Sequence, residues 1–393
     1  MSNIINTRSP YFINQQADTG KILSEATIEL YIYNGELGVD KPAGSTYSIT
    51  KSSIGSTANN YITFEVSELI RDYLYTDYYN EAIHAVWVEA DISYTHTDST
   101  TGTNNIDYLA FDGFGYFEEG INPRTSTYAD NTSYTPMVLQ DNTTVYFVRG
   151  RDIRIPIFSE SWAEVITTVG YGVWNEETDY WQESLPEWQS TTSPLYVDDT
   201  DFSDRKIQYI IISSDNALDG DTITITSRNQ TSDPNYVEQE VVITLKEICE
   251  PKFDEYRCIF YNKYGALQDF WASKKSIITT KTKSTQFNRS IIDFSSGAAQ
   301  YSVYKNANQR FDIVANQSIT VNTPFIVEDI NEPIEQMIMS ENTWLEDSSN
   351  TSIDTLPVTI RTESLTRKTR VNDKLIQYTL EFDYAFDKIN NIR

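Results

Sequence analysis

The stretch Ala26-Thr-Ile-Glu-Leu-Tyr-Ile-Tyr33 decides the fold class of this chain. Its aliphatic residues stand at every second position, at Ile28, Leu30 and Ile32, and glutamate or tyrosine follows each of them. Alternation with a period of two predicts a β-strand that buries one face and exposes the other. Similar short runs recur along the chain with turn residues between them, which is typical of β-sandwiches.

The composition supports the same fold class. The 393 residues include 27 Tyr, 17 Phe and 7 Trp but only 4 Met. Aromatic and β-branched residues favour pleated surfaces, and the abundant Asn, Asp, Ser and Thr supply turns. Because the chain is also too long for one ordinary core, we expect a mostly β protein. It should contain two or three β-sandwich-like domains with one or two short helices.

Two segments break the strand pattern and predict the helices. One lies near residues 67–75, where Ser67 can cap the N-terminus and apolar residues recur at helical spacing. The other spans residues 327–339 and carries an apolar stripe. Elsewhere, Pro156 interrupts a strand-like run. Because proline cannot donate to a sheet ladder, we expect that strand at a sheet edge.

Charge is divided unevenly along the chain. Residues 1–250 hold 39 Asp and Glu against 13 Lys and Arg, whereas residues 251–393 hold 18 against 17. A further division at residue 122 gives −12 for 1–122, −14 for 123–250 and −1 for 251–393. We expect three domains with these bounds: two acidic β domains, the second with a Trp-rich excursion at 174–204, and one near-neutral β domain. Because the near-neutral domain lacks self-repulsion, we predict that it makes most inter-subunit contacts.

Several classes of partner are disfavoured by these features. The acidic balance repels nucleic acid. No apolar run approaches the roughly 20 residues that a membrane span requires, and the N-terminus shows no apolar signal region, so we expect a protein that is soluble as made. Cys249 and Cys258 lie nine positions apart. Two reduced cysteines in adjoining strands are favoured over a disulfide, which stays possible, and no cofactor is indicated.

Candidate catalytic groups are few. The two histidines are His84, at the start of a strand, and His96, in a polar loop, and no nucleophile motif accompanies either. We therefore predict that replacing either histidine leaves function intact apart from stability. Glycosidases need only two placed carboxylates. The candidate pairs are Glu118-Glu119, Glu176-Glu177 and Glu183 with Glu187. Surface solvation is the favoured explanation of such pairs in a chain with 57 acidic residues.

Two further patterns could bind a ligand. The acidic loops Asp198–Asp204 and Asp215–Asp221 could offer oxygen atoms to Ca²⁺, although neither matches the EF-hand pattern. Trp174, Trp181 and Trp188 recur at intervals of seven and could stack on a surface glycan or dock a protein. A small aromatic core in the excursion accounts for the tryptophans as well.

Several strings together carry a resemblance to a known class of proteins. They are Arg8–Ile13, Phe64–Leu74, Leu109–Asn122, Tyr261–Trp271 and the ending Leu375–Arg393. The chain resembles virion structural proteins of tailed bacteriophages, of the kind found in tail, neck or baseplate assemblies. The resemblance implies a multi-copy component of a symmetric particle, made in the host cytoplasm and contacting other virion proteins. It transfers no functional residue, because the shared strings are packing motifs.

The sequence thus favours a non-enzymatic structural subunit that forms homo-oligomers. A receptor- or carbohydrate-binding fibre or adhesin module is the alternative, and a glycan-cleaving enzyme comes third.

Overall fold

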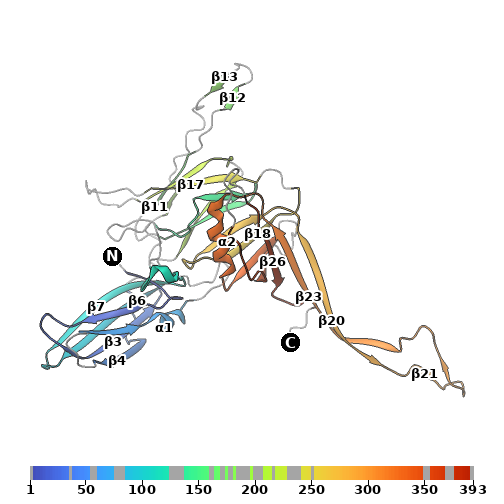
Figure 1. Ribbon diagram of the computed structural model, residues 1–393, viewed down its shortest axis with the longest axis horizontal. Coiled ribbons are helices and arrows are strands. Elements are labelled where there is room, and N and C mark those ends of the chain that lie inside the picture. Colours follow the sequence, from blue (N-terminus) through green and yellow to red (C-terminus); the bar gives the residue numbers. More distant parts are fainter. Residues whose placement is uncertain are drawn as a thin grey trace. The chain divides into compact units, whose positions relative to one another are not determined.

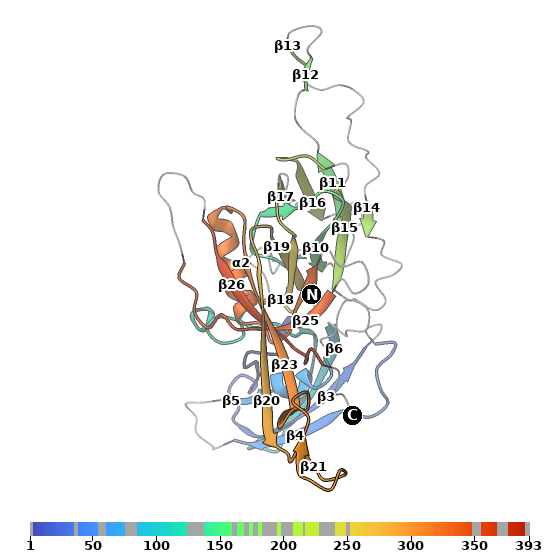
Figure 2. The ribbon, with the colours of Figure 1, turned by 90° about the vertical axis from the view of Figure 1, so that its right-hand side faces the viewer.

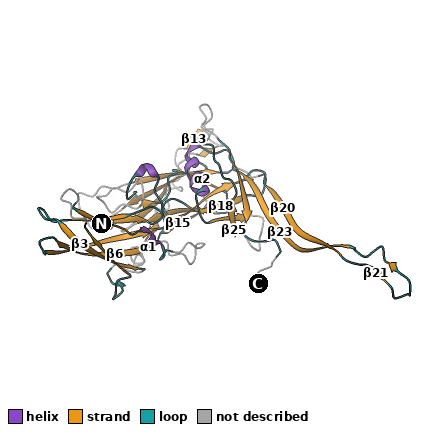
Figure 3. Cartoon of the chain, turned by 60° about the horizontal axis from the view of Figure 1, so that its bottom comes forward, coloured by secondary structure: helices purple, strands orange, loops and turns teal. Residues whose placement is uncertain are grey.

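The computed structural model confirms a mostly β protein, with far more strand than helix among the described residues (Figure 3). The structure describes residues 3–34, 38–53, 60–74, 85–123, 137–158, 163–168, 173–175, 180–182, 195–197, 207–214, 217–227, 240–248, 252–347, 355–367 and 376–389. The chain divides into two compact units. Unit 1 comprises residues 1–249, 259–270 and 329–341, and unit 2 comprises residues 250–258, 271–328 and 342–393.

The N-terminal part of unit 1 is built on a five-stranded sheet in the order β1-β7-β6-β3-β4 (Figure 1). The strands are β1 (Asn3–Asn6), β3 (Leu23–Tyr33), β4 (Tyr47–Ser52), β6 (Ala85–His96) and β7 (Thr101–Phe111). A separate pair, β2 (Phe12–Gln16) and β5 (Tyr61–Glu65), contributes to the same core. The alternation predicted from residues 26–33 is confirmed for Ile28 to Tyr31, because Ile28 and Leu30 are fully buried and Glu29 and Tyr31 are partly exposed. It is wrong for Tyr33, which is buried at 8% exposure and packs in a second core with Trp87.

The first predicted helix is present, but its cap differs from the prediction. Helix α1 spans Ser67–Arg71, and its N-cap residue is Val66, which makes no side-chain cap hydrogen bond. Ser67 is therefore the first helical residue. Its backbone N–H and its hydroxyl both donate to the Glu65 carboxylate. A carboxylate two residues upstream thus takes the orphan donor that we had expected the Ser67 side chain to serve.

The rest of unit 1 up to residue 249 holds three more sheets, with the strand orders β15-β10-β8, β14-β11-β16-β17-β9 and β12-β13. Their bounds are β8 (Met137–Val138), β9 (Thr144–Phe147), β10 (Asp152–Phe158), β11 (Ala163–Thr168), β12 (Val173–Asn175), β13 (Tyr180–Gln182), β14 (Leu195–Val197), β15 (Gln208–Ser213), β16 (Thr222–Ser227) and β17 (Glu240–Glu247). Aliphatic residues of the first two sheets share one core.

The edge position predicted for the Pro156 strand is wrong. β10 is the central strand of its sheet, with β15 on one side and β8 on the other. Pro156 faces Tyr209 in β15. On the other side its carbonyl accepts a hydrogen bond from the N–H of Leu139 at 2.9 Å. The missing proline N–H therefore removes one bond from the β8 side only, and β8 is just two residues long.

Strands β18 (Tyr256–Tyr261) and β19 (Leu267–Ala272) are neighbours, and the boundary between the two units passes through both. The second predicted helix is confirmed as a 3₁₀ turn, η5 (Glu328–Ile330), followed by α2 (Asn331–Ile338). The apolar stripe is buried, with Ile330 at 4% exposure and Ile334 and Met337 at 0%.

Unit 2 contains strands in the hydrogen-bonded order β24-β25-β26-β23-β20 and a small pair, β21-β22. Their bounds are β20 (Ile277–Asn288), β21 (Ile292–Asp293), β22 (Gln300–Tyr301), β23 (Asn308–Asn322), β24 (Thr343–Asp347), β25 (Thr355–Ile360) and β26 (Thr379–Tyr384). The expected domains 1–122, 123–250 and 251–393 stay a prediction. The observed division assigns residues 259–270 and 329–341 to unit 1.

Candidate interaction surface

His96 occupies a structural position. It is 1% exposed at the end of β6. Its Nε2 lies 3.3 Å from the backbone N of Asp18, and its Nδ1 lies 3.1 Å from Oγ1 of Thr100. Both ring nitrogens of His96 are therefore hydrogen-bonded to residues of neighbouring loops. His84 lies outside the described residues.

The carboxylate pairs are only partly described. Glu118 and Glu119 stand in a 3₁₀ turn, η1 (Phe117–Glu119). Glu119 accepts a hydrogen bond from Nζ of Lys263 at 3.0 Å, so this carboxylate is engaged in an ion pair. The four other candidates, Glu176, Glu177, Glu183 and Glu187, lie outside the described residues.

The predicted calcium loops give a mixed picture. Residues 198–204 and Asp215 lie outside the described residues. Asp219 accepts a hydrogen bond from the Glu247 N–H at 3.0 Å, and Asp221 accepts one from the Leu218 N–H at 2.7 Å. The other carboxylate oxygen of Asp221 is buried and has no hydrogen-bond partner. Within the described ranges, no group of three His, Cys, Asp or Glu side chains is placed to hold a metal ion.

The tryptophans and cysteines are described only in part. The backbone register pairs Trp174 in β12 with Trp181 in β13, whereas Trp188 lies outside the described residues. The predicted aromatic binding surface therefore stays a prediction. Cys258 is buried in β18, and Cys249 lies outside the described residues.

The turn of residues 262–266, between β18 and β19, joins three segments of unit 1. The carbonyl of Lys263 accepts a hydrogen bond from the Phe114 N–H at 2.7 Å, which attaches the end of the N-terminal sheet. The side chain of Asn262 donates to the carbonyl of Leu139 at 2.6 Å. The Lys263 N–H donates to Oε1 of Gln336 in α2 at 3.1 Å. This buried polar turn therefore fixes the two β regions and the helix of unit 1 to one another.

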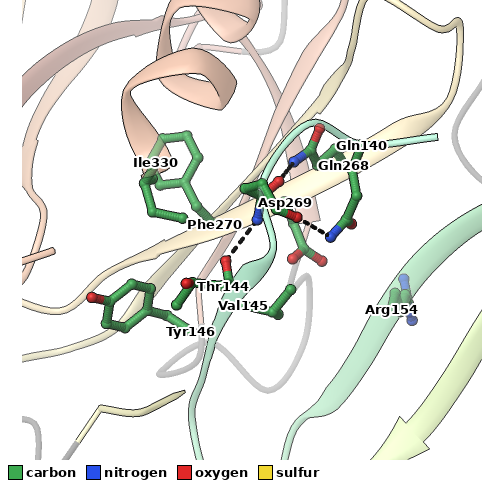
Figure 4. Close-up of a pocket in the computed structure, with 10 residues that line it drawn as sticks. Gln140, Thr144, Val145, Tyr146, Arg154, Gln268, Asp269, Phe270 and Ile330 are labelled. Carbon is green, nitrogen blue, oxygen red and sulfur yellow. Dashed lines mark hydrogen bonds between the residues drawn. The ribbon is translucent and has the colours of Figure 1, made fainter. Parts of the chain in front are cut away.

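A small pocket lies beside this turn (Figure 4). Three amide side chains converge on it and bond to protein atoms. Gln268 donates to Oδ1 of Asn142 at 2.6 Å, and Gln140 donates to the Asn142 carbonyl at 2.9 Å. Asn142 donates to the Thr144 carbonyl at 2.7 Å. The hydrogen bonds of these three amides thus go to one another and to the backbone. The three amides therefore connect neighbouring segments of unit 1.

Among the described residues, ten exposed apolar side chains gather on one segment of unit 2. We call residues 277–320 the arm: β20, the paired part of β23, and the tip between them that contains β21 and β22. In the arm, β20 pairs antiparallel with β23 from Ile277 opposite Thr320 to Asn288 opposite Asn308, with a register shift between Lys283 and Thr285. Figures 1 and 2 show it as the long orange ribbon that ends at β21. All residues of β20 except Ser284 are exposed.

Large apolar side chains concentrate on this arm. Tyr304 is 93% exposed, and Phe294 is 67% exposed. The other exposed apolar residues of the arm are Ile277, Ile278, Phe287, Ile292, Tyr301, Val303, Phe311 and Ile313. An isolated two-stranded ribbon is marginally stable in water. Apolar side chains gathered on such a ribbon are typical of a surface that a partner covers.

The charge of the arm is opposite to that of the chain. Residues 277–320 carry five Lys and Arg against two Asp, a balance of +3 on a chain of −27. Lys281 and Lys283 stand two positions apart in β20 and so share one face of the ribbon. The arm is therefore a basic, apolar surface on an acidic protein.

The sequence patterns do not predict this arm. Its signal was the run Ile277-Ile-Thr-Thr-Lys-Thr-Lys283, which is rich in β-branched residues and lacks an apolar–polar alternation. A strand without a buried face gives no period-two pattern.

Comparisons with known proteins identify no family for this chain. No protein-family model matches the chain, and no curated protein matches it. Two solved structures show weak similarity. The native conformation of E. coli alpha-2-macroglobulin aligns at 7% identity with a TM-score of 0.20, covering 84% of this chain and 21% of that chain. The Bacteroides ovatus mixed-linkage glucan utilization protein SGBP-B aligns at 8% identity with a TM-score of 0.16, covering 97% and 94%. Neither score carries an argument about fold or function.

Among the described helices, none is both long and apolar enough to cross a membrane.

Proposed function

We propose that this chain is a non-enzymatic structural subunit that assembles with copies of itself and with other proteins through the arm. The assembly is of the kind that forms the tail, neck or baseplate of a tailed-phage virion. The observation that carries the proposal is the arm itself, a ribbon with exposed aromatic and aliphatic side chains from Ile277 to Ile313. Aromatic side chains are enriched where protein partners bind.

Two observations on the candidate catalytic groups support a non-enzymatic role. His96 is buried between two loops, and Glu119 is paired with Lys263. His96 and Glu119 therefore already contribute to the packing of unit 1.

The test compares two sets of variants of the full chain. Phe294→Ser with Tyr304→Ser removes the exposed aromatic groups at the tip. Phe117→Ser is the matched control, because Phe117 is 99% exposed and lies outside the arm. Light scattering coupled to size-exclusion chromatography should show oligomers for the wild type and the control, and monomers for the tip variant. All three should unfold at similar temperatures.

Two results would overturn the proposal. One is a wild-type chain that stays monomeric at all concentrations and binds a cell-surface glycan on an array, which would favour the receptor-binding alternative. The other is a tip variant that forms the same oligomers as the wild type, seen by light scattering and negative-stain microscopy.

A further inference from the structure

The N-terminal sheet carries four acidic residues in a compact arrangement, which we call the acidic block: Glu29, Glu89, Asp91 and Asp107. Glu29 in β3 stands directly opposite Asp91 in β6, and Glu89 in β6 stands directly opposite Asp107 in β7. The alternation of side chains puts all four on the same face of the sheet. Like charges directly opposite one another destabilise a sheet. The block therefore opposes the stability of the fold that contains it.

One lysine partly neutralises the acidic block. Nζ of Lys41 lies 2.7 Å from Glu89 and 3.2 Å from Asp91. None of the described cations forms an ion pair with Asp107. Burial, followed by the charge of Glu89, raises the pKa of the Asp107 carboxyl. Glu89 itself is buried at 7% exposure, so the negative charge that reaches the surface comes from the partly exposed Glu29, Asp91 and Asp107.

A bound metal ion does not account for this negative charge. The carboxylates of the block are spread over three strands, and no three of them are placed to hold a metal, as noted for the described residues above. The side chains instead form an acidic surface whose repeat follows the strands. Asp91 in β6 stands opposite Asn105 in β7, and Asp107 lies two positions further along β7, so Asp91 and Asp107 are diagonal neighbours about 7–8 Å apart.

The arm has the complementary pattern. Lys281 and Lys283 are two positions apart in an extended strand, so their spacing is about 7 Å, close to that of Asp91 and Asp107. Both lysines are exposed, and neither forms an ion pair with a described residue. β20 also lies at the edge of its sheet, with β23 as its hydrogen-bonded neighbour among the described strands. The lysine face of the arm is thus open to a partner.

We propose that the arm of one copy of this chain binds the acidic block of a second copy, with Lys281 and Lys283 against Glu29, Asp91 and Asp107. This inference rests on the proposed function and names its partner. The charges of the two surfaces are opposite, their spacings agree, and both belong to the same chain. Because each copy carries one arm and one block, the contact is head-to-tail and builds a ring or a filament.

The test is an exchange of charge between the two surfaces. The arm variant is Lys281→Glu with Lys283→Glu, and the block variant is Glu29→Lys with Asp107→Lys. Each variant alone should associate at least about tenfold more weakly than the wild type, because close interfacial charge pairs contribute more than 1.4 kcal/mol. An equimolar mixture of the two variants should recover association, since each arm then meets a block of opposite charge.

A matched control is Lys274→Glu with Lys275→Glu, which changes the net charge equally just before β20 and should associate like the wild type. Analytical ultracentrifugation at low and high salt measures all of these. Two weakened variants that do not recover on mixing would overturn the acidic block as the partner, while loss of association in the tip variant would still support the proposed function. An arm variant that associates like the wild type would overturn the role of the lysines.

Discussion

The side-chain amide of Asn262 donates to the carbonyl of Leu139 at 2.6 Å, where Pro156 has no N–H to offer. The register places Leu139 directly opposite Pro156, and the Leu139 N–H already bonds to the Pro156 carbonyl at 2.9 Å. In such an antiparallel pair the second bond would run from residue 156 to the Leu139 carbonyl. Asn262 therefore replaces the missing donor of a central strand.

This replacement predicts a coupling between residues 156 and 262. Asn262→Ala should lower the free energy of unfolding by about 2–4 kcal/mol. The substitution removes the hydrogen-bond donor to the Leu139 carbonyl and the acceptor for the backbone N–H groups of Tyr264 and Ala266. Pro156→Val restores a backbone donor. The double variant should therefore be less destabilised than the sum of the single variants. Urea unfolding of all four proteins gives the coupling, and strict additivity would contradict it.

The contact between residues 112–114 and the 262–266 turn has no room for a side chain at Gly113. A Cβ atom there would lie 2.6 Å from the Lys263 carbonyl oxygen and 2.8 Å from Oδ1 of Asn6. Gly113→Ala should therefore lower the free energy of unfolding by about 1–3 kcal/mol. Gly44→Ala, with open space around its Cβ, is the control and should be neutral. Equal stability of the two variants in thermal unfolding would be evidence against this close contact at Gly113.

Asp221 predicts a pH-dependent gain in stability. Burial raises the pKa of its carboxyl above the ordinary value of 3.8. A raised folded pKa favours folding at low pH, and this contribution is lost as the pH rises through the folded value. Asp221→Asn keeps an acceptor oxygen for the Leu218 N–H and removes the charge. It should be more stable than the wild type at pH 7, by up to about 1 kcal/mol, and lose this advantage near pH 4.

The same variant addresses the predicted calcium site. If the loop of residues 215–221 binds Ca²⁺, millimolar CaCl₂ should stabilise the wild type more than Asp221→Asn. Differential scanning fluorimetry with Mg²⁺ as the control ion measures this difference. Equal melting temperatures with and without Ca²⁺ would exclude the loop as a calcium site.

Asp107 predicts a conflict between stability and association. Asp107→Asn removes a like-charge pair with Glu89, so it should raise the free energy of unfolding at pH 7 by about 0.2–1 kcal/mol. Because the folded pKa of Asp107 is raised, the gain should fade as the pH drops toward 3.8. The same variant should associate more weakly than the wild type. A variant that is both less stable and equally associated would contradict the assignment of the block.

The sequence predicts an element well where the pattern of apolar and polar residues within that element reflects its burial. The strand at residues 26–33 has one buried and one exposed face, so its alternation predicted β3 correctly. The stripe of residues 327–339 predicted α2 for the same reason. The edge position predicted from Pro156 was wrong, because Asn262, which supplies the missing hydrogen bond, is more than a hundred positions away in the sequence.

Neither the arm nor the acidic block could be predicted from short stretches of sequence, and the physical reasons differ. The arm is exposed on both faces along most of β20, so its sequence carries no periodic contrast. The opposition of Glu89 and Asp107 depends on the register between β6 and β7, which the separate strand patterns do not fix. The prediction that the region after residue 250 makes most inter-subunit contacts agrees with the position of the arm and stays a prediction.

The lysines of β20 also oppose pairing between the arms of two copies of the chain. An edge strand with apolar side chains invites pairing with an identical strand, which leads to uncontrolled aggregation. Two arms brought together would each contribute a net charge of +3 and would repel one another. Lysines on such an edge therefore disfavour pairing between two arms while leaving the edge accessible to a surface of opposite charge.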